Sequence, residues 1–154
     1  MKQRFNRILV AVDDSPCTEK AIEYAKDIAQ EFNSVVALIT VVPPNTVSNI
    51  GADPIMGQQP IIIPEALEIQ MESASDELRK LAAEFTGAQE VFVFNKVGGI
   101  RDEIIDTAAS WSADLIIMGS NGRTGFEHLI SGSVSESVIR KASCPVLVIP
   151  NKCD

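Results

Sequence analysis

The sequence predicts an α/β fold, a single domain with an open, doubly wound, five-stranded parallel sheet and helices on both faces. Five short apolar runs, rich in β-branched residues, alternate with segments in which apolar residues recur every three or four positions. These are the patterns of buried parallel strands and of amphipathic helices. The 154 residues, 45% of them hydrophobic, suit one domain with a filled core.

The five strands are expected where the apolar runs are continuous, at residues 8–12, 35–42, 91–94, 115–118 and 146–149. Polar residues from Asp13 to Ser15 end the first run. Pro43 and Pro44 end the second, because proline cannot donate a hydrogen bond to a central ladder.

Four helices are expected between the strands. Ser15 is a suitable cap for the first, with Pro16 as its first helical residue, and Pro64 opens the longest, which we expect to end before Gly87. Strict alternation with right-handed crossovers leaves few windings. Among these we choose strand order 3-2-1-4-5.

Residues 43–64 form the least patterned segment of the chain. Five of the eight prolines lie here, together with two glycines, so we expect a long loop. The segment has two interpretations that the sequence leaves open, a mobile lid and a tolerated surface insertion.

The chosen strand order reverses between the first and fourth strands. Ligands of open α/β sheets bind beyond the carboxyl ends of the strands at such a reversal. We therefore expect Asp13 and Gly119, which follow these two strands, to face each other across one crevice.

A glycine-rich stretch follows the fourth strand and leads into the last helix. Glycine lets backbone N–H groups approach a ligand, and a helix N-terminus offers unpaired donors and partial positive charge, so the stretch suits phosphate. A simple turn capped by Ser133 explains only part of it, and neither the P-loop nor the Rossmann pattern fits the chain. The residues concerned are Gly119, Gly122, Gly125, Gly132, Ser133 and Ser135.

The spacing of these residues matches G-2X-G-9X-G-(S/T), the signature of the ATP-binding universal stress proteins, and the chain resembles that family over nearly its whole length. The segments RILVAVDDS (7–15), GSVSESVI (132–139) and CPVLVIP (144–150), and the pair Gly98 and Gly99, carry the resemblance further. Two residues depart from the common pattern. Asp14 stands where the family often has glycine, and Asn121 stands where it often has histidine.

The glycine loop and the resemblance together define a candidate site for ATP and Mg²⁺. Backbone groups of the loop should hold the phosphates, while Arg123 either pairs with a phosphate or is solvated. The resemblance implies that Asp13 reaches the ribose or a bound Mg²⁺, that Val41 offers backbone groups to adenine, and that Ala11 and Met118 line the pocket. The candidate residues are Ala11, Asp13, Val41, Met118, Gly119, Ser120, Asn121, Gly122, Arg123, Thr124, Gly125, Gly132, Ser133, Val134 and Ser135, with Asp13 also the candidate metal ligand.

Composition limits the other partners. A net charge of −8 argues against nucleic acid and against an anionic membrane surface. The three cysteines share no C-x-x-C spacing and the chain has one histidine, His128, so we expect neither a disulfide framework nor a Cys/His metal site. No apolar run suits a signal peptide or a membrane span, and we expect a cytoplasmic protein.

These features predict an ATP-binding sensor or regulator of the stress response with at most slow ATP hydrolysis and no assigned catalytic residue. A nucleotide-dependent phosphotransferase or ATPase is the alternative, and a ligand-independent dimeric interaction module is a second one. The apolar edge strand at 146–149 predicts a homodimer, as the resemblance also implies. In the competing interpretation, the C-terminal tail or the long loop caps this edge in a monomer.

Overall fold

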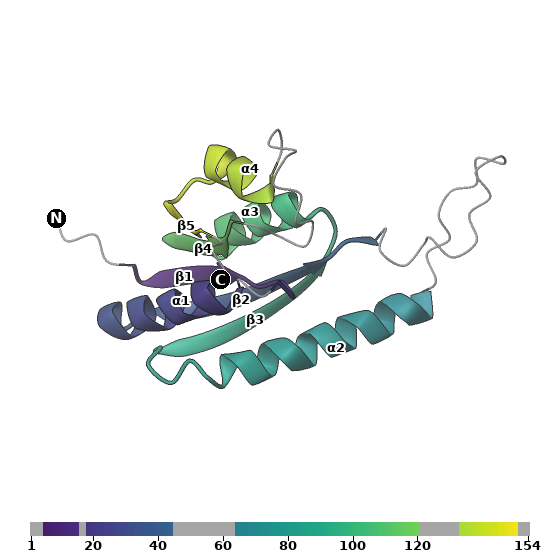
Figure 1. The fold of residues 1–154 in the computed structure, drawn as a ribbon, viewed down its shortest axis with the longest axis horizontal. Helices are drawn as coiled ribbons and strands as arrows, with labels where there is room; N and C mark the ends of the chain where they lie inside the picture. Colours follow the sequence, from purple (N-terminus) through teal and green to yellow (C-terminus); the bar gives the residue numbers. More distant parts are fainter. Residues whose placement is uncertain (1–4, 16–17, 45–63, 121–132, 151–154) are drawn as a thin grey trace.

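The structure is a computed structural model that describes residues 5–15, 18–44, 64–120 and 133–150. All its strands are parallel and form one five-stranded sheet in the order β3-β2-β1-β4-β5. Helices lie on both faces of the sheet (Figure 1). The predicted fold class and strand order are therefore confirmed.

The strands agree with the apolar runs except at the sheet's edge. They are β1 (Arg7–Ala11), β2 (Val35–Val42), β3 (Glu90–Val97), β4 (Leu115–Gly119) and β5 (Val146–Ile149). The prediction for β3 was too short, because Asn95 and Lys96 are polar, yet every residue of this strand pairs with β2. An edge strand tolerates such residues, since one of its sides has no partner strand.

The helices are α1 (Thr18–Phe32), α2 (Pro64–Ala82), α3 (Ile100–Ser110) and α4 (Val134–Lys141). Pro16, expected to begin α1, and most of the expected loop at 43–64 lie outside the described residues. Helix α2 ends earlier than predicted. Phe85, which extends its apolar pattern, lies in the turn that follows, where its N–H donates to the carbonyl of Ala82 and its side chain is buried.

Two apolar cores lie on opposite faces of the sheet, because side chains alternate along each strand. Ile8 and Val10 of β1 face the core shared with α1 and α2, whereas Leu9 faces the core shared with α3 and α4. Figure 1 shows these helix pairs on either side of the sheet. In the described parts of the chain, no helix is both long and apolar enough to cross a membrane.

Trp111 lies half-buried at the C-terminal end of α3. Its ring packs edge-on against Phe92 and Phe94 of β3, with centroids 6.2 and 6.3 Å away. The guanidinium of Arg7 lies 4.2 Å from the centroid of the indole, and its Nε donates to the Trp111 carbonyl. The residue thus joins α3 to β1 and β3.

Candidate functional site

The apolar candidates for an adenine pocket come together where β1, β2 and β4 end. Val10 pairs with Leu38 of β2 and with Ile117 of β4, so the next positions along the chain, Ala11 and Met118, lie on adjacent strands. Val41 and Met118 belong to the core under α3 and α4, and the partly buried Ala11 packs against it. The predicted residues therefore share one face and one end of the sheet.

The backbone of Val41 faces the place where β1 has ended. The register between β1 and β2 runs to Ala11 and Ile39, and the Ile39 carbonyl accepts a hydrogen bond from Val12 N–H. Polar backbone groups two residues apart point to the same side of a strand. The N–H and C=O of Val41 therefore point toward the side of β2 on which β1 lies. Because β1 contacts β2 only as far as Val12, a planar ring could reach these two groups beyond the end of β1.

Asp13 closes the turn between β1 and α1. Its Oδ1 accepts hydrogen bonds from the N–H of Ser15 at 2.9 Å, from Ser15 Oγ at 2.6 Å and from Thr18 Oγ1. Asp13 therefore has a structural role in this turn with or without a ligand. Thr18, a buried partner that sequence reasoning missed, is recognisable only as a hydroxyl residue near the expected helix start.

Two serines connect the start of α4 to the end of β4. Ser133 is the N-cap, and its Oγ accepts from Glu136 N–H at 3.2 Å. The buried Ser135 donates from Oγ to the carbonyl of Ser120 at 3.4 Å, while Ser120 N–H donates to Ile149. The N-terminus of α4 thus lies close to the residue that follows β4.

Only the two flanks of the predicted phosphate loop lie within the described residues. Gly119, Ser120, Ser133, Val134 and Ser135 are described and lie on the two flanks of the loop. The remaining candidates lie outside the described residues, namely Asn121, Gly122, Arg123, Thr124, Gly125 and Gly132.

A cavity that the sequence did not predict lies next to the expected crevice between Asp13 and Gly119. Asp13 lines a cavity of about 640 Å³ on the α1 and α2 side of the sheet. Gly119 and Ser133 are not among its described lining residues. The cavity arises from the placement of α2, which the sequence pattern does not specify.

Among the described residues, no three His, Cys, Asp or Glu side chains lie close enough together to hold a metal ion without a further ligand. Asp13 offers a single carboxylate whose Oδ1 is already engaged. Mg²⁺ commonly binds through one or two carboxylates together with substrate phosphates. Asp13 accordingly fits a Mg²⁺ ion that arrives with a nucleotide.

Cys144 is half-buried and packs against the core under α3 and α4. Burial raises the pKa of its thiol, and the negative charge of Asp114 raises that pKa further. The thiol therefore stays protonated at neutral pH and is a poor nucleophile.

Comparison with known proteins identifies the family of the chain. The model of the universal stress protein family matches residues 4–150. The universal stress protein MJ0531 of Methanocaldococcus jannaschii is 34% identical over 145 residues, which cover 94% of this chain and 82% of that protein.

Solved structures give the same result. The structure of MJ0577, from the same organism, is 26% identical, covers 97% of this chain and 99% of its own, and superimposes with a TM-score of 0.81. A universal stress protein from Archaeoglobus fulgidus, solved in complex with dAMP, is 26% identical with a TM-score of 0.56, covering 94% of this chain and 98% of its own. The family model covers nearly the whole chain, and the chain therefore belongs to the universal stress protein family.

Proposed function

We propose that the chain binds an adenine nucleotide, ATP with Mg²⁺, beyond the ends of β1, β2 and β4, and that it acts as a nucleotide-dependent regulator of the stress response with at most slow hydrolysis. The observation that carries the proposal is the meeting of Ala11, Val41 and Met118 on one face beside the N-terminus of α4. The dAMP complex of the Archaeoglobus fulgidus relative supports the nucleotide class.

The adenine end of the ligand is assigned to the strands. Ala11 and Met118 offer apolar contact, and the backbone of Val41 can donate to and accept from the edge of the ring. Such a mixed surface, apolar with a few directed polar groups, is typical of cofactor pockets.

The phosphate end is assigned to α4 and the glycine loop before it. The first turn of α4 directs backbone N–H groups away from the helix, and its dipole favours negative charge there. Ser133 Oγ and Ser135 Oγ lie 3.4 Å apart at this end. The glycines that lead to Ser133 keep side chains away from the approaching phosphates.

Mg²⁺ would neutralise phosphate charge when bound, with Asp13 as its protein ligand. The carboxylate is held in place by its hydrogen bonds to Ser15 and Thr18. Asp13 is therefore oriented before a nucleotide arrives, which reduces the entropy lost on binding.

Gly122→Val is the test of the phosphate site. A β-branched side chain placed where backbone must approach a phosphate should weaken binding of ATP with Mg²⁺ by about tenfold or more, measured by titration calorimetry. Gly99→Val is the matched control, because Gly99 has an ordinary φ of −71° and a Cβ there would meet nothing closer than Asp102 Oδ2 at 3.4 Å. A folded Gly122→Val protein with wild-type affinity would refute the assigned phosphate site.

We also propose a homodimer built on β5. This strand is an edge of the sheet, and three of its four residues are only half-buried in the single chain. Pairing two copies about a two-fold axis would satisfy the backbone groups of the edge and bury these side chains.

Val148→Lys is expected to shift the protein from dimer to monomer in sedimentation velocity, because it places a charge in the paired edge. Tyr24→Lys makes a similar change on α1, where the native side chain is 54% exposed, and should leave the dimer intact. Thermal melting of both variants shows that they fold. A wild-type monomer, or a folded Val148→Lys dimer, contradicts this interface.

A further inference from the structure

Strand β3 forms the edge of the sheet opposite β5. It pairs with β2 along its whole length, and the N–H of Gly98, just beyond it, donates to the Val42 carbonyl. Polar backbone groups two residues apart point to the same side of a strand, so every second residue back to Glu90 also faces β2. The N–H and C=O groups of the intervening residues therefore point outward from the sheet, at Val91, Val93, Asn95 and Val97. Within the described ranges, no backbone group pairs with them.

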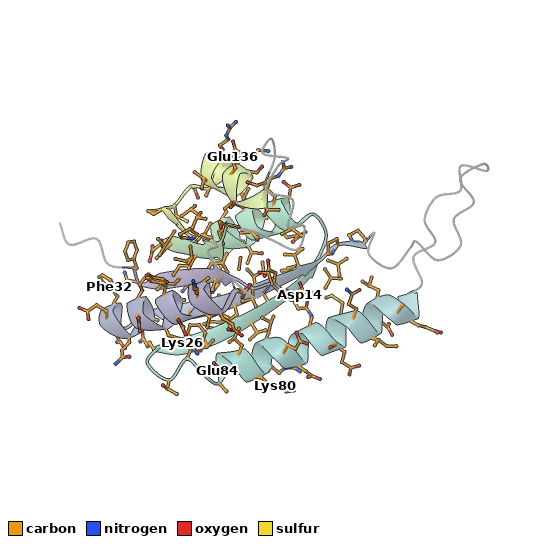
Figure 2. All side chains as sticks on the ribbon, viewed as in Figure 1. Asp14, Lys26, Phe32, Lys80, Glu84 and Glu136 are labelled. Carbon is orange, nitrogen blue, oxygen red and sulfur yellow. The ribbon has the colours of Figure 1, made fainter. Side chains whose placement is uncertain are left out.

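Contacts at the C-terminal end of α2 hold this helix toward the middle of the sheet. Lys26 of α1 forms an ion pair at 2.6 Å with Glu84, which lies in the turn after α2 (Figure 2). The Lys26 ammonium also lies 5.7 Å from the ring centroid of Phe85. Because α1 packs chiefly against β1 and β4, these contacts draw α2 away from the free edge of β3.

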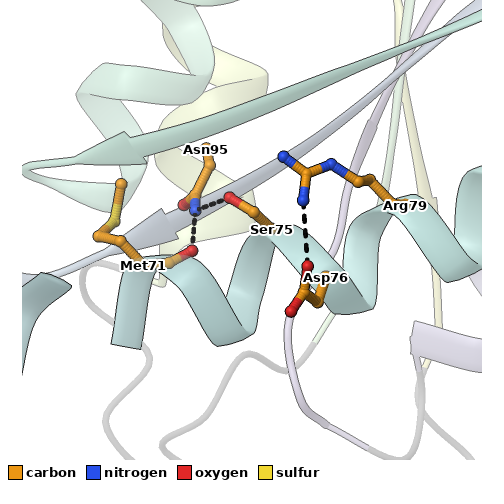
Figure 3. A network of polar contacts seen from close by, with 5 residues as sticks. All are labelled: Met71, Ser75, Asp76, Arg79 and Asn95. Carbon is orange, nitrogen blue, oxygen red and sulfur yellow. Dashed lines mark hydrogen bonds and ion pairs between the residues drawn. The ribbon is translucent and has the colours of Figure 1, made fainter. Parts of the chain in front are cut away.

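Asn95 attaches the middle of α2 to the face of β3 and not to its edge. Its Nδ2 donates to the Met71 carbonyl at 2.6 Å and to Ser75 Oγ at 2.8 Å (Figure 3). Other residues of α2 line a cavity together with Thr40 and Val42 of β2. The helix therefore spans β2 and β3 on one face and does not occupy the free edge.

Two large apolar side chains of β3 lie exposed next to this edge. Phe92 is 39% exposed and Val97 is 38% exposed, and no other strand in the described parts of the chain carries a large apolar residue as exposed as these. The two side chains lie on opposite faces of the sheet, because side chains alternate along a strand. A long, regular edge strand with apolar side chains on both faces tends to pair with another strand unless it is blocked.

Two opposite charges lie at the two ends of the same strand. Glu90 is exposed, and Lys96 is half-buried with its ammonium 5.9 Å from the ring centroid of Phe94. Neither charge forms an ion pair with another described residue. A lysine on an edge strand normally opposes pairing. A strand that pairs here must therefore bring a carboxylate opposite Lys96.

A second copy of β3 brings that carboxylate to the required position. In an antiparallel pair with the two-fold axis at Val93, Lys96 lies opposite Glu90 of the second copy, and the same contact recurs on the other side of the axis. Phe92 and Phe94 lie opposite each other in the same way. Opposite charges and aromatic rings placed directly across an antiparallel pair stabilise it. The strand is thus complementary to itself in charge and in side-chain type.

The backbone supports the same register. Residues that exchange hydrogen bonds in an antiparallel pair must both direct their N–H and C=O groups toward the partner strand. Val93 at the axis does so, and Val91 lies opposite Asn95 of the second copy, which also does so. Moving the axis by one residue in either direction would leave Lys96 opposite an uncharged residue. The charges therefore select one register among those that the backbone allows.

We propose that the free edge of β3 is a self-association surface, on which a second copy of the chain pairs its own β3 in the antiparallel sense with the two-fold axis at Val93. This surface lies at the opposite edge of the sheet from β5. A molecule that uses both edges links into assemblies larger than a dimer. The proposal rests neither on nucleotide binding nor on the β5 dimer.

The Val148→Lys protein isolates the β3 edge, because its lysine blocks β5. Pairing of one strand buries little surface, so we expect a weak contact with a Kd of about 0.1–1 mM. The variant should remain monomeric at micromolar concentrations and associate only as its concentration approaches that range. Backbone amide resonances recorded over a dilution series give affinity and location, and the shifts should centre on Val91, Val93 and Asn95. If the wild type is itself monomeric it replaces the variant, so the β5 and β3 proposals fail separately.

Charge-swap variants in the same protein test the register. Glu90→Lys and Lys96→Glu each place like charges opposite one another at both ends of the pair, and each should raise the Kd about tenfold or more. The double variant Glu90→Lys/Lys96→Glu restores opposite charges and should restore the original Kd. Glu23→Lys is the matched control, since it makes the same change of charge at an exposed position on α1 and should leave the Kd unchanged. Thermal melting shows that the variants fold.

Three results would overturn the proposal. A protein that stays monomeric throughout the dilution series would leave the edge to an occupant other than a second copy. Concentration-dependent shifts confined to residues outside β3 would place self-association on another surface. A folded double variant that associates no better than the two single variants would exclude the pairing of Glu90 with Lys96.

Discussion

Leu38→Ala is expected to lower the free energy of unfolding by about 3–5 kcal/mol, the range for a large-to-small change in a closed core. Leu38 has no exposed surface and lies on β2 in the core shared with α1 and α2. Because β2 pairs with β1 on one side and β3 on the other, its backbone has little freedom to move into the space left. Urea denaturation followed by circular dichroism measures the change.

Ile69→Ala is the control for this prediction. Ile69 has the same number of side-chain carbon atoms as leucine but is 69% exposed, so its loss should change the free energy of unfolding by less than about 1 kcal/mol. If the two variants lost similar amounts of unfolding free energy, Leu38 would not be a core residue and Ile69 a surface residue, as their exposed fractions indicate.

The sheet was predictable because its strands are buried on both faces. Val36, Ala37 and Leu38 are all fully buried, so selection for apolar side chains produces a continuous run that is visible in the sequence. β3 was harder because it is an edge strand, and Asn95 interrupts the run while making a specific contact with α2. A polar residue that serves a tertiary contact looks like a strand end in the sequence alone.

The candidate site was predictable where it depends on local spacing. Ser133 caps α4 because a hydroxyl next to a helix start satisfies a free N–H, and this requires only neighbouring residues. The orientation of the Val41 backbone depends on where β1 ends relative to β2, which only the register reveals. The cavity between α1 and α2 depends on helix placement across long sequence separations, and no local pattern encodes it.

Asp13→Ala is expected to have two effects, because Asp13 has both a structural role and a proposed binding role. Removing the acceptor of Ser15 N–H, Ser15 Oγ and Thr18 Oγ1 should cost about 2 kcal/mol of stability, within the range for losing hydrogen bonds to a charged group. Loss of the carboxylate should also weaken binding of ATP with Mg²⁺ by about tenfold or more. Thermal melting and calorimetry measure the two effects separately.

Asp13→Asn distinguishes these roles. Asparagine keeps an oxygen that can accept from Ser15 and Thr18, so most of the stability should remain, whereas the negative charge that a bound Mg²⁺ needs is gone. Asp27→Asn, an exposed change on α1, controls for the altered net charge and should affect neither property. If a stable Asp13→Asn protein bound ATP with Mg²⁺ as tightly as the wild type, the role of Asp13 would be limited to stabilising the turn after β1. Asp13 would then be excluded as a metal ligand. Weaker binding at near-native stability would instead establish that the carboxylate that closes the first turn also acts on the nucleotide.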